Sequence, residues 1–84
     1  MHIKLYIKPW CGWCHEAIDW LNKNKFTFET LDITSDGSAA QEMRRISGQS
    51  LTPTIDIDGQ VLPDFSVDEL KRFLDEIEVK YPAQ

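Results

Sequence analysis

The chain has 84 residues, of which 42% are hydrophobic, and a formal net charge of −5 at pH 7. This hydrophobic fraction excludes an intrinsically disordered chain and supports one core, so we expect a single domain spanning residues 1–84. The sequence contains no apolar run near the roughly 18 residues of a membrane helix, and no basic stripe that would neutralise nucleic-acid phosphates. We therefore expect neither a membrane nor a nucleic acid as partner.

The first half of the chain predicts a strand, a helix and a second strand. Residues 2–7 alternate in the manner of a strand, and Pro9 ends it. From about residue 11 to residue 23, apolar side chains recur at i, i+3, i+4 and i+7 and mark one face of a helix. Residues 26–32 carry the apolar positions of a second strand. The strand–helix–strand order predicts a right-handed parallel crossover.

The second half predicts a helix, a hairpin and a last helix. Asp36 is suited to cap a helix, and Gly48 stands where such a helix would end. Asp58-Gly59 is a strong turn signal between two short strands. Ser66 and Glu69 have the spacing of a capping box, which opens the last helix. The order β-α-β-α-β-β-α predicts an α/β fold of thioredoxin-like type, a four-stranded mixed sheet with helices on both faces.

The two cysteines, Cys11 and Cys14, have C-x-x-C spacing. A disulfide across two residues closes too small a loop to constrain the unfolded chain much, so the pair indicates chemistry rather than a structural cross-link. Cys11 would stand at a helix N-terminus, where unpaired N–H groups and the helix dipole favour a thiolate. Cys14, one turn later on the apolar face, should be more buried and less ionised. We expect Cys11 to attack a disulfide and Cys14 to resolve the mixed disulfide.

Other uses of these residues fit the sequence less well. A structural zinc site needs four ligands, and the chain adds only His2 and His15 to the two cysteines. His2 begins the first strand, too far from the cysteines at about 3.3 Å per residue, so we predict no metal ligands. His15 points away from the apolar face of its helix, which favours a solvated side chain over an acid or base. Two inert core cysteines would require the strand–turn–helix context to be wrong.

Four segments, in order and at matching spacing, resemble the glutaredoxin family. Residues 6–14 are similar to its opening, with a basic residue before a C-x-x-C that has an aromatic third position. Residues 47–53 resemble its T-G-Q-x-T-V-P segment, Asp58-Gly59 matches its hairpin, and residues 68–70 match its D-D-L. The resemblance spans nearly the whole chain and implies the glutaredoxin fold and thiol–disulfide oxidoreductase activity.

The resemblance also implies a glutathione site. Pro53 would be a cis-proline facing the cysteines, and it would leave the backbone of Thr52 to pair with a substrate. Lys8 would bind the glycine carboxylate of glutathione. Val67 and Asp68, at a helix N-terminus, would bind its γ-glutamyl end.

Several positions depart from the family pattern. Trp13 stands where tyrosine is usual; we count it among the glutathione contacts and expect it to form a substrate-facing platform with Trp10. Gly12 replaces a proline, as in members that bridge a [2Fe–2S] cluster between two protomers. Leu51-Thr52 replaces Thr-Val. Residues 62–66 replace a glycine pair and resemble glutaredoxin-like hydrogen donors of ribonucleotide reductase. Within them, Pro63-Asp64-Phe65 have the bulk to crowd the γ-glutamyl pocket.

Three functions therefore remain open. The first is reduction of glutathione mixed disulfides and protein disulfides, with glutathione as reductant. The second is a protein disulfide reductase recharged by thioredoxin reductase. The third is a [2Fe–2S] carrier that dimerises through Cys11 and glutathione. We expect glutathione and disulfide-containing proteins as partners, a monomer, and a cytoplasmic location, because the N-terminal segment lacks the apolar stretch of a signal peptide.

Overall fold

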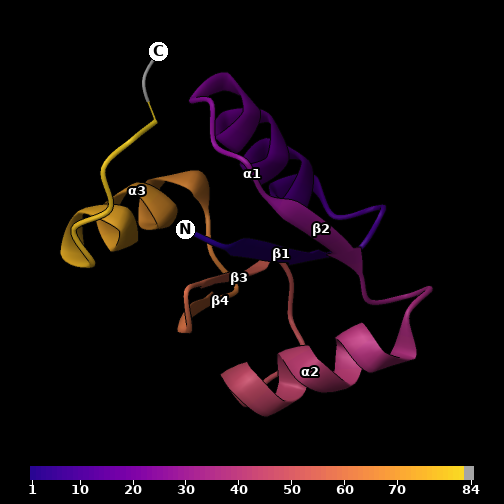
Figure 1. The fold of residues 1–84 in the computed structure, drawn as a ribbon. Helices are drawn as coiled ribbons and strands as arrows, with labels where there is room; N and C mark the ends of the chain where they lie inside the picture. Colours follow the sequence, from indigo (N-terminus) through magenta and orange to yellow (C-terminus); the bar gives the residue numbers. More distant parts are fainter. Residues whose placement is uncertain (83–84) are drawn as a thin grey trace.

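The computed structural model describes residues 1–82, which form one mixed sheet with helices packed on it (Figure 1). The elements in chain order are β1 (Ile3–Ile7), α1 (Gly12–Lys23), β2 (Glu29–Asp32), α2 (Gly37–Ser47), β3 (Thr54–Ile57), β4 (Gln60–Pro63) and α3 (Val67–Glu76). Within these residues no helix combines the length and apolar character needed to span a membrane. The element order is the one that the sequence predicts.

The four strands lie in the order β2-β1-β3-β4. β1 runs parallel to β2 and antiparallel to β3, and β4 is antiparallel to β3, so the sheet is mixed. Figure 1 shows α1 and α3 on one face of the sheet and α2 on the other. The predicted thioredoxin-like fold and the parallel crossover through α1 are confirmed.

Local signals in the sequence set the ends of the elements. The Asp36 carboxylate caps α2 by accepting from the N–H groups of Ser38 and Ala39 at 3.0 and 3.2 Å, and Gly48 ends that helix at a φ of 71°. A left-handed residue in this position is typically glycine, which has no Cβ to clash. The predicted capping box between Ser66 and Glu69 is also present at the start of α3.

The second strand is shorter than predicted, because β2 begins at Glu29 rather than at residue 26. After α1 the chain turns through Lys25, which has a φ of 67°, and the Phe26 N–H donates to the carbonyl of Leu21 at 3.0 Å. Phe26 is only 5% exposed and packs in the core. Its apolar character therefore reflects packing beneath the helix, and periodicity alone could not separate this from a strand.

The core has two parts, one on each side of the sheet. The larger lies between the sheet and the helices α1 and α3, and the smaller joins Tyr6 to Ala39 and Met43 of α2. Phe65 is fully buried in the larger part. Of the three residues 63–65 expected to crowd the γ-glutamyl pocket, Phe65 does not do so, because its apolar ring is removed from water inside the core.

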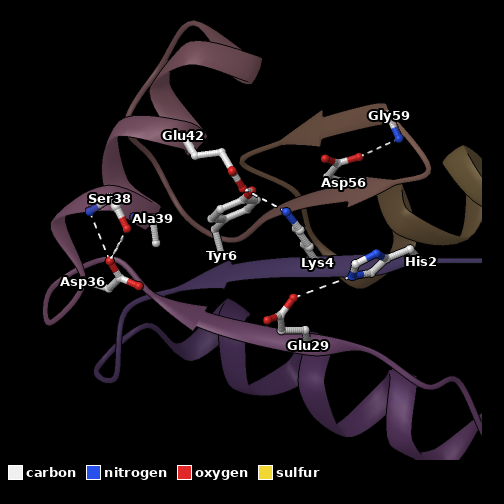
Figure 2. Close-up of polar contacts among 10 residues, drawn as sticks. All are labelled: His2, Lys4, Tyr6, Glu29, Asp36, Ser38, Ala39, Glu42, Asp56 and Gly59. Atoms are coloured by element: carbon white, nitrogen blue, oxygen red, sulfur yellow. Dashed lines mark hydrogen bonds and ion pairs between the residues drawn. The ribbon is translucent and has the colours of Figure 1, made fainter.

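A polar cluster covers part of the α2 face (Figure 2). The Tyr6 hydroxyl donates to the Glu42 carboxylate, and the Lys4 ammonium lies 3.3 Å from the same carboxylate. Burial, followed by the bond to Glu42, raises the pKa of Tyr6 well above its usual value. The cluster therefore ties α2 to β1 by a charge-assisted hydrogen bond at a fully buried tyrosine.

The register brings three connecting segments to the same end of the sheet. Tyr6, Thr54 and Pro63 stand in one row across β1, β3 and β4. The chain leaves β1 and β4 at this row and enters β3 there. Three connecting segments therefore adjoin this end of the sheet: residues 8–11, 52–53 and 64–66.

Candidate functional site

Cys11 occupies the N-cap of α1, as the sequence predicts. Its backbone is extended, with φ −84° and ψ 112°, and its Sγ accepts from the Cys14 N–H at 3.2 Å. The Cys11 N–H donates to the Lys8 carbonyl at 3.1 Å, which closes the turn between β1 and α1. Cys11 is partly exposed, so its sulfur lies at the helix end within reach of solvent. Unpaired N–H groups of a first helical turn stabilise a negative charge there.

The two sulfurs differ in acidity. Burial is the largest single influence on Cys11 and raises its pKa. Hydrogen bonds from the Cys14 thiol, the Thr52 hydroxyl and the N–H groups of Cys14 and Trp13 outweigh it and bring the pKa below its usual value. Cys14 is only 1% exposed. Its burial, and then its hydrogen bond to Cys11, raise the pKa of Cys14 to about 11. The pair can therefore hold one anionic and one protonated sulfur at neutral pH.

The segment that enters β3 meets Cys11 at Thr52. The Thr52–Pro53 peptide bond is cis, as the resemblance implies, and Pro53 is fully buried. The Cys11 thiol donates to the Thr52 carbonyl at 3.7 Å. Residues from the first helix and from the entry to the third strand thus meet at one point.

Three exposed apolar side chains belong to the two segments that meet at Cys11. We call Trp10, Trp13 and Leu51 the apolar rim; they are 73%, 49% and 53% exposed. The two tryptophans flank Cys11 in sequence, whereas Leu51 precedes the residue whose carbonyl contacts Cys11. The sequence predicts the tryptophan platform but not Leu51, because its position depends on the contact between α1 and the start of β3.

The predicted glutathione contacts divide into two groups. The Thr52 and Lys8 carbonyls accept from the Cys11 thiol and the Cys11 N–H. Pro53 directly follows Thr52, and Trp13 lies in the first turn of α1. Val67 and Asp68 begin α3 beyond β4, on the segment that leaves the same end of the sheet. The structure thus brings Thr52 and Lys8 into hydrogen-bond contact with Cys11, and it places Val67 and Asp68 at the same end of the sheet without a hydrogen bond to either cysteine.

His15 is exposed, as expected, but its ring is not free. Its Nε2 lies 2.6 Å from the Pro9 carbonyl, so the imidazole bridges the first turn of α1 and the loop before Cys11. No spacing rule in the sequence signals this contact, because it depends on how the chain turns between Lys8 and Cys11.

The described residues also limit metal binding. Within residues 1–82 there is no group of three or more His, Cys, Asp or Glu side chains that could hold a metal ion. A metal at this site would have Cys11 as its accessible ligand from this chain, because Cys14 is buried.

Comparisons with known proteins agree with this geometry. The sequence profile of the glutaredoxin family matches residues 3–62. An uncharacterised glutaredoxin-like 8.6 kDa protein in the rubredoxin operon of Clostridium pasteurianum is 32% identical over 73 residues, which cover 87% of this chain and 97% of that protein. Glutaredoxin 3 of Escherichia coli is 32% identical over 59 residues, which cover 70% of this chain and 71% of that protein.

A solved structure extends the comparison to the whole fold. The glutaredoxin-like protein NrdH-redoxin from Escherichia coli superposes with a TM-score of 0.76, covers 100% of both chains and is 23% identical. At this identity the match shows the shared fold. Together with the profile match and the sequence relatives, it establishes that this chain belongs to the glutaredoxin family of thiol–disulfide oxidoreductases.

Proposed function

We propose that this chain reduces glutathione mixed disulfides and protein disulfides, with Cys11 as the attacking thiol and Cys14 as the resolving thiol. The observation that carries this proposal is the inequality of the sulfurs: Cys11 is partly exposed with a lowered pKa, and Cys14 is buried with a raised one. Exchange requires a thiolate to attack and a second thiol close by to release the substrate. One helical turn separates the two.

The reaction runs in two steps. The Cys11 thiolate bonds to one sulfur of a disulfide, and the other sulfur leaves with the electron pair and takes up a proton from water. Cys14 then loses its proton and bonds to Cys11, and the substrate leaves as a second thiolate. The substrate is reduced to two thiols while the chain becomes a Cys11–Cys14 disulfide. Alternatively, a glutathione thiol attacks the mixed disulfide and frees Cys11.

Glutathione is the proposed reductant. Phe65 lies in the core and does not crowd the start of α3. The capping box there uses the N–H groups of Ser66 and Glu69, so those of Val67 and Asp68, also in the first turn, would bind the γ-glutamyl carboxylate. The proposed glutathione contacts are Lys8, Trp13, Thr52, Pro53, Val67 and Asp68. Two glutathione thiols would reduce the Cys11–Cys14 disulfide and become glutathione disulfide.

A second candidate reductant is thioredoxin reductase. Exposed carboxylates stand at the same place, because Asp64 precedes α3 and Asp68 and Glu69 lie in its first turn. These negative charges repel the carboxylates of glutathione, an anionic peptide, within the screening length of about 8 Å. The apolar rim, in contrast, fits a protein surface. In either case we propose a monomer working in the cytoplasm, where thiols are kept reduced.

Recharging the oxidised protein in two reconstituted systems separates these candidates. One contains glutathione, glutathione reductase and NADPH, and the other contains thioredoxin reductase and NADPH. We expect the first to restore both free thiols, counted with a thiol reagent. Restoration only by the second would replace glutathione with thioredoxin reductase as the reductant. A Cys11→Ser variant, which cannot form the Cys11–Cys14 disulfide, gives the background consumption of NADPH.

A shared [2Fe–2S] cluster is the third possibility to be tested at this site. Cys11 suits one cluster ligand, because its sulfur is partly exposed at a helix end. The remaining ligands would come from a second copy and from glutathione. Anaerobic reconstitution with iron, sulfide and glutathione would give a coloured dimer that Cys11→Ser does not form. A colourless monomer would remove this possibility.

A further inference from the structure

The side chain of His15 restrains the loop that precedes the attacking thiol. Its Nε2 lies 2.6 Å from the Pro9 carbonyl oxygen. A carbonyl oxygen only accepts hydrogen bonds, so this ring nitrogen carries a hydrogen and donates it. His15 belongs to α1, whereas Pro9 lies in the connection between β1 and α1. The bond therefore attaches one peptide group of that connection to the helix.

Cys11 does not depend on the imidazole for its own position. Its N–H donates to the Lys8 carbonyl at 3.1 Å, and its carbonyl accepts from the backbone N–H of His15 at 3.2 Å. Its Sγ accepts from the Cys14 N–H at 3.2 Å. In all three bonds the partner of Cys11 is a backbone group, which remains when the side chain of His15 is changed. Loss of the imidazole should therefore leave the attacking sulfur in place.

Trp10, between Pro9 and Cys11, has less support. The Pro9 carbonyl and the Trp10 N–H belong to one planar peptide group, so a bond to that carbonyl sets the plane from which the Trp10 side chain starts. Within residues 1–82, the hydrogen bond to this peptide group comes from His15. The Trp10 side chain is largely exposed, so packing contributes little to holding it. The order of Trp10 therefore depends on the His15 side chain.

We infer that His15 is a positioning residue that orders Trp10 next to the attacking thiol and thereby favours protein disulfides over small ones. This inference rests on the proposed function. An aromatic side chain that is already ordered loses less conformational entropy when a protein partner covers it, and aromatic side chains contribute much of the binding energy at protein interfaces. A small disulfide that reaches only the sulfur gains nothing from Trp10. His15 thus acts on the choice of substrate and not on the exchange chemistry.

The test compares His15→Phe with His15→Gln. Phenylalanine keeps a planar ring without the donor, whereas glutamine keeps an N–H donor and does not titrate, so it cannot act as an acid or base. Asp19→Phe adds the same ring at an exposed position one turn further along α1 and is the matched control. The reduced chain is mixed with an excess of insulin, a protein disulfide, or of bis(2-hydroxyethyl) disulfide, a small neutral one. Free thiols counted after acid quenching give a rate constant for each substrate.

His15→Phe should lower the rate constant with insulin about fivefold, the effect of one typical hydrogen bond, and should leave the rate constant with the small disulfide unchanged. His15→Gln and Asp19→Phe should match the unaltered chain with both substrates. In a Trp10→Ala background, His15→Phe should have no further effect, because His15 acts through Trp10. Nuclear magnetic relaxation should show the order parameter of the Trp10 amide falling below the rigid value of about 0.85 in His15→Phe.

Equal rate constants with insulin in His15→Phe and the unaltered chain would overturn the inference. A loss by the same factor with both disulfides would also overturn it, and so would a His15→Gln variant as slow as His15→Phe. If His15→Phe aggregates, His15→Ala makes the same comparison.

The design separates this inference from the proposed function. If the unaltered chain reduces neither disulfide, the proposed exchange chemistry fails. If the unaltered chain reduces both and His15→Phe matches it, only the role of His15 fails. Both reactions start from the reduced chain alone, so the identity of the physiological reductant does not affect the result.

Discussion

At the scale of single residues, two identical side chains one helical turn apart acquire different acidities. Cys11 receives hydrogen bonds at the open end of α1, including the 3.2 Å bond from the Cys14 N–H. Cys14 lies inside, where burial disfavours its charged form. The difference arises from position along one helix and needs no charged neighbour as its main cause.

This difference predicts unequal effects of two serine substitutions. Cys11→Ser should abolish all exchange, because serine is not a nucleophile toward disulfides. Cys14→Ser should keep reduction of glutathione mixed disulfides, for which a second glutathione can free Cys11, and should lose reduction of protein disulfides by the dithiol route. Turnover of a glutathione mixed disulfide and of a protein disulfide checks this. Equal loss in both variants would contradict the proposed roles.

The structural roles of single residues could be predicted from the sequence where a local rule applies. The C-x-x-C pair, the caps at Asp36 and Ser66 and the turn at Gly59 depend on neighbours in the chain. The family pattern also predicted the cis bond before Pro53. The contact from His15 to the loop and the burial of Phe65 could not be predicted, because each depends on contacts that form only when the chain folds.

At the scale of elements, the first helical position of α1 can accept proline, whose backbone is less flexible than that of glycine. Gly12 occupies the first helical position, and Cys11 before it has the extended backbone that a following proline requires. Apart from its chain neighbours and the nearby backbone of its own helix, a Cβ at Gly12 would meet no atom within 4 Å. Gly12→Pro should therefore stabilise the reduced protein by about 0.4–1 kcal/mol, because the unfolded chain loses freedom.

Denaturant unfolding of the reduced protein measures this effect. Gly48→Ala is the opposing control: at a φ of 71° an alanine is strained, so this variant should lose about 1 kcal/mol or more. A decrease in stability on Gly12→Pro would show that the first turn of α1 needs the freedom of glycine.

The contact between α2 and the sheet predicts a pH-dependent stability. The bond from the Tyr6 hydroxyl is the largest influence that lowers the pKa of Glu42, with Lys4 adding to it. A lowered pKa in the folded state stabilises the protein above the unfolded pKa of about 4.3, and this stabilisation is lost as the pH falls through the folded value. Glu42→Gln should therefore cost about 1 kcal/mol at pH 7 and less as the pH falls below about 4.

Urea unfolding at several pH values checks this, with the exposed Glu76→Gln as control. A difference between Glu42→Gln and the unaltered chain that stays constant with pH would mean that the charge of Glu42 contributes nothing. The hydrogen bond from Tyr6 would then act only as a neutral contact.

At the scale of the whole molecule, the sheet brings distant segments of the chain to one site. Tyr6, Thr54 and Pro63 lie in one row near one end of the sheet. The loop that contains Cys11, the segment that contains Thr52 and the entry to α3 therefore all lie at that end. The element order predicts this arrangement in outline, because strand direction follows from the crossover and the hairpin. The sequence alone could not predict the contact between Cys11 and the Thr52 carbonyl, since no local rule relates residues 41 positions apart.

The central claim is that the fold makes Cys11 the more acidic thiol of the pair. Titration of the reduced protein by thiolate absorbance, repeated on Cys14→Ser to assign the groups, tests it most directly. We predict that the pKa of Cys11 lies below the ordinary value of a free cysteine and that the other thiol titrates near pH 11. A Cys11 that titrates at or above the free value, or a Cys14 that titrates first, would contradict the account.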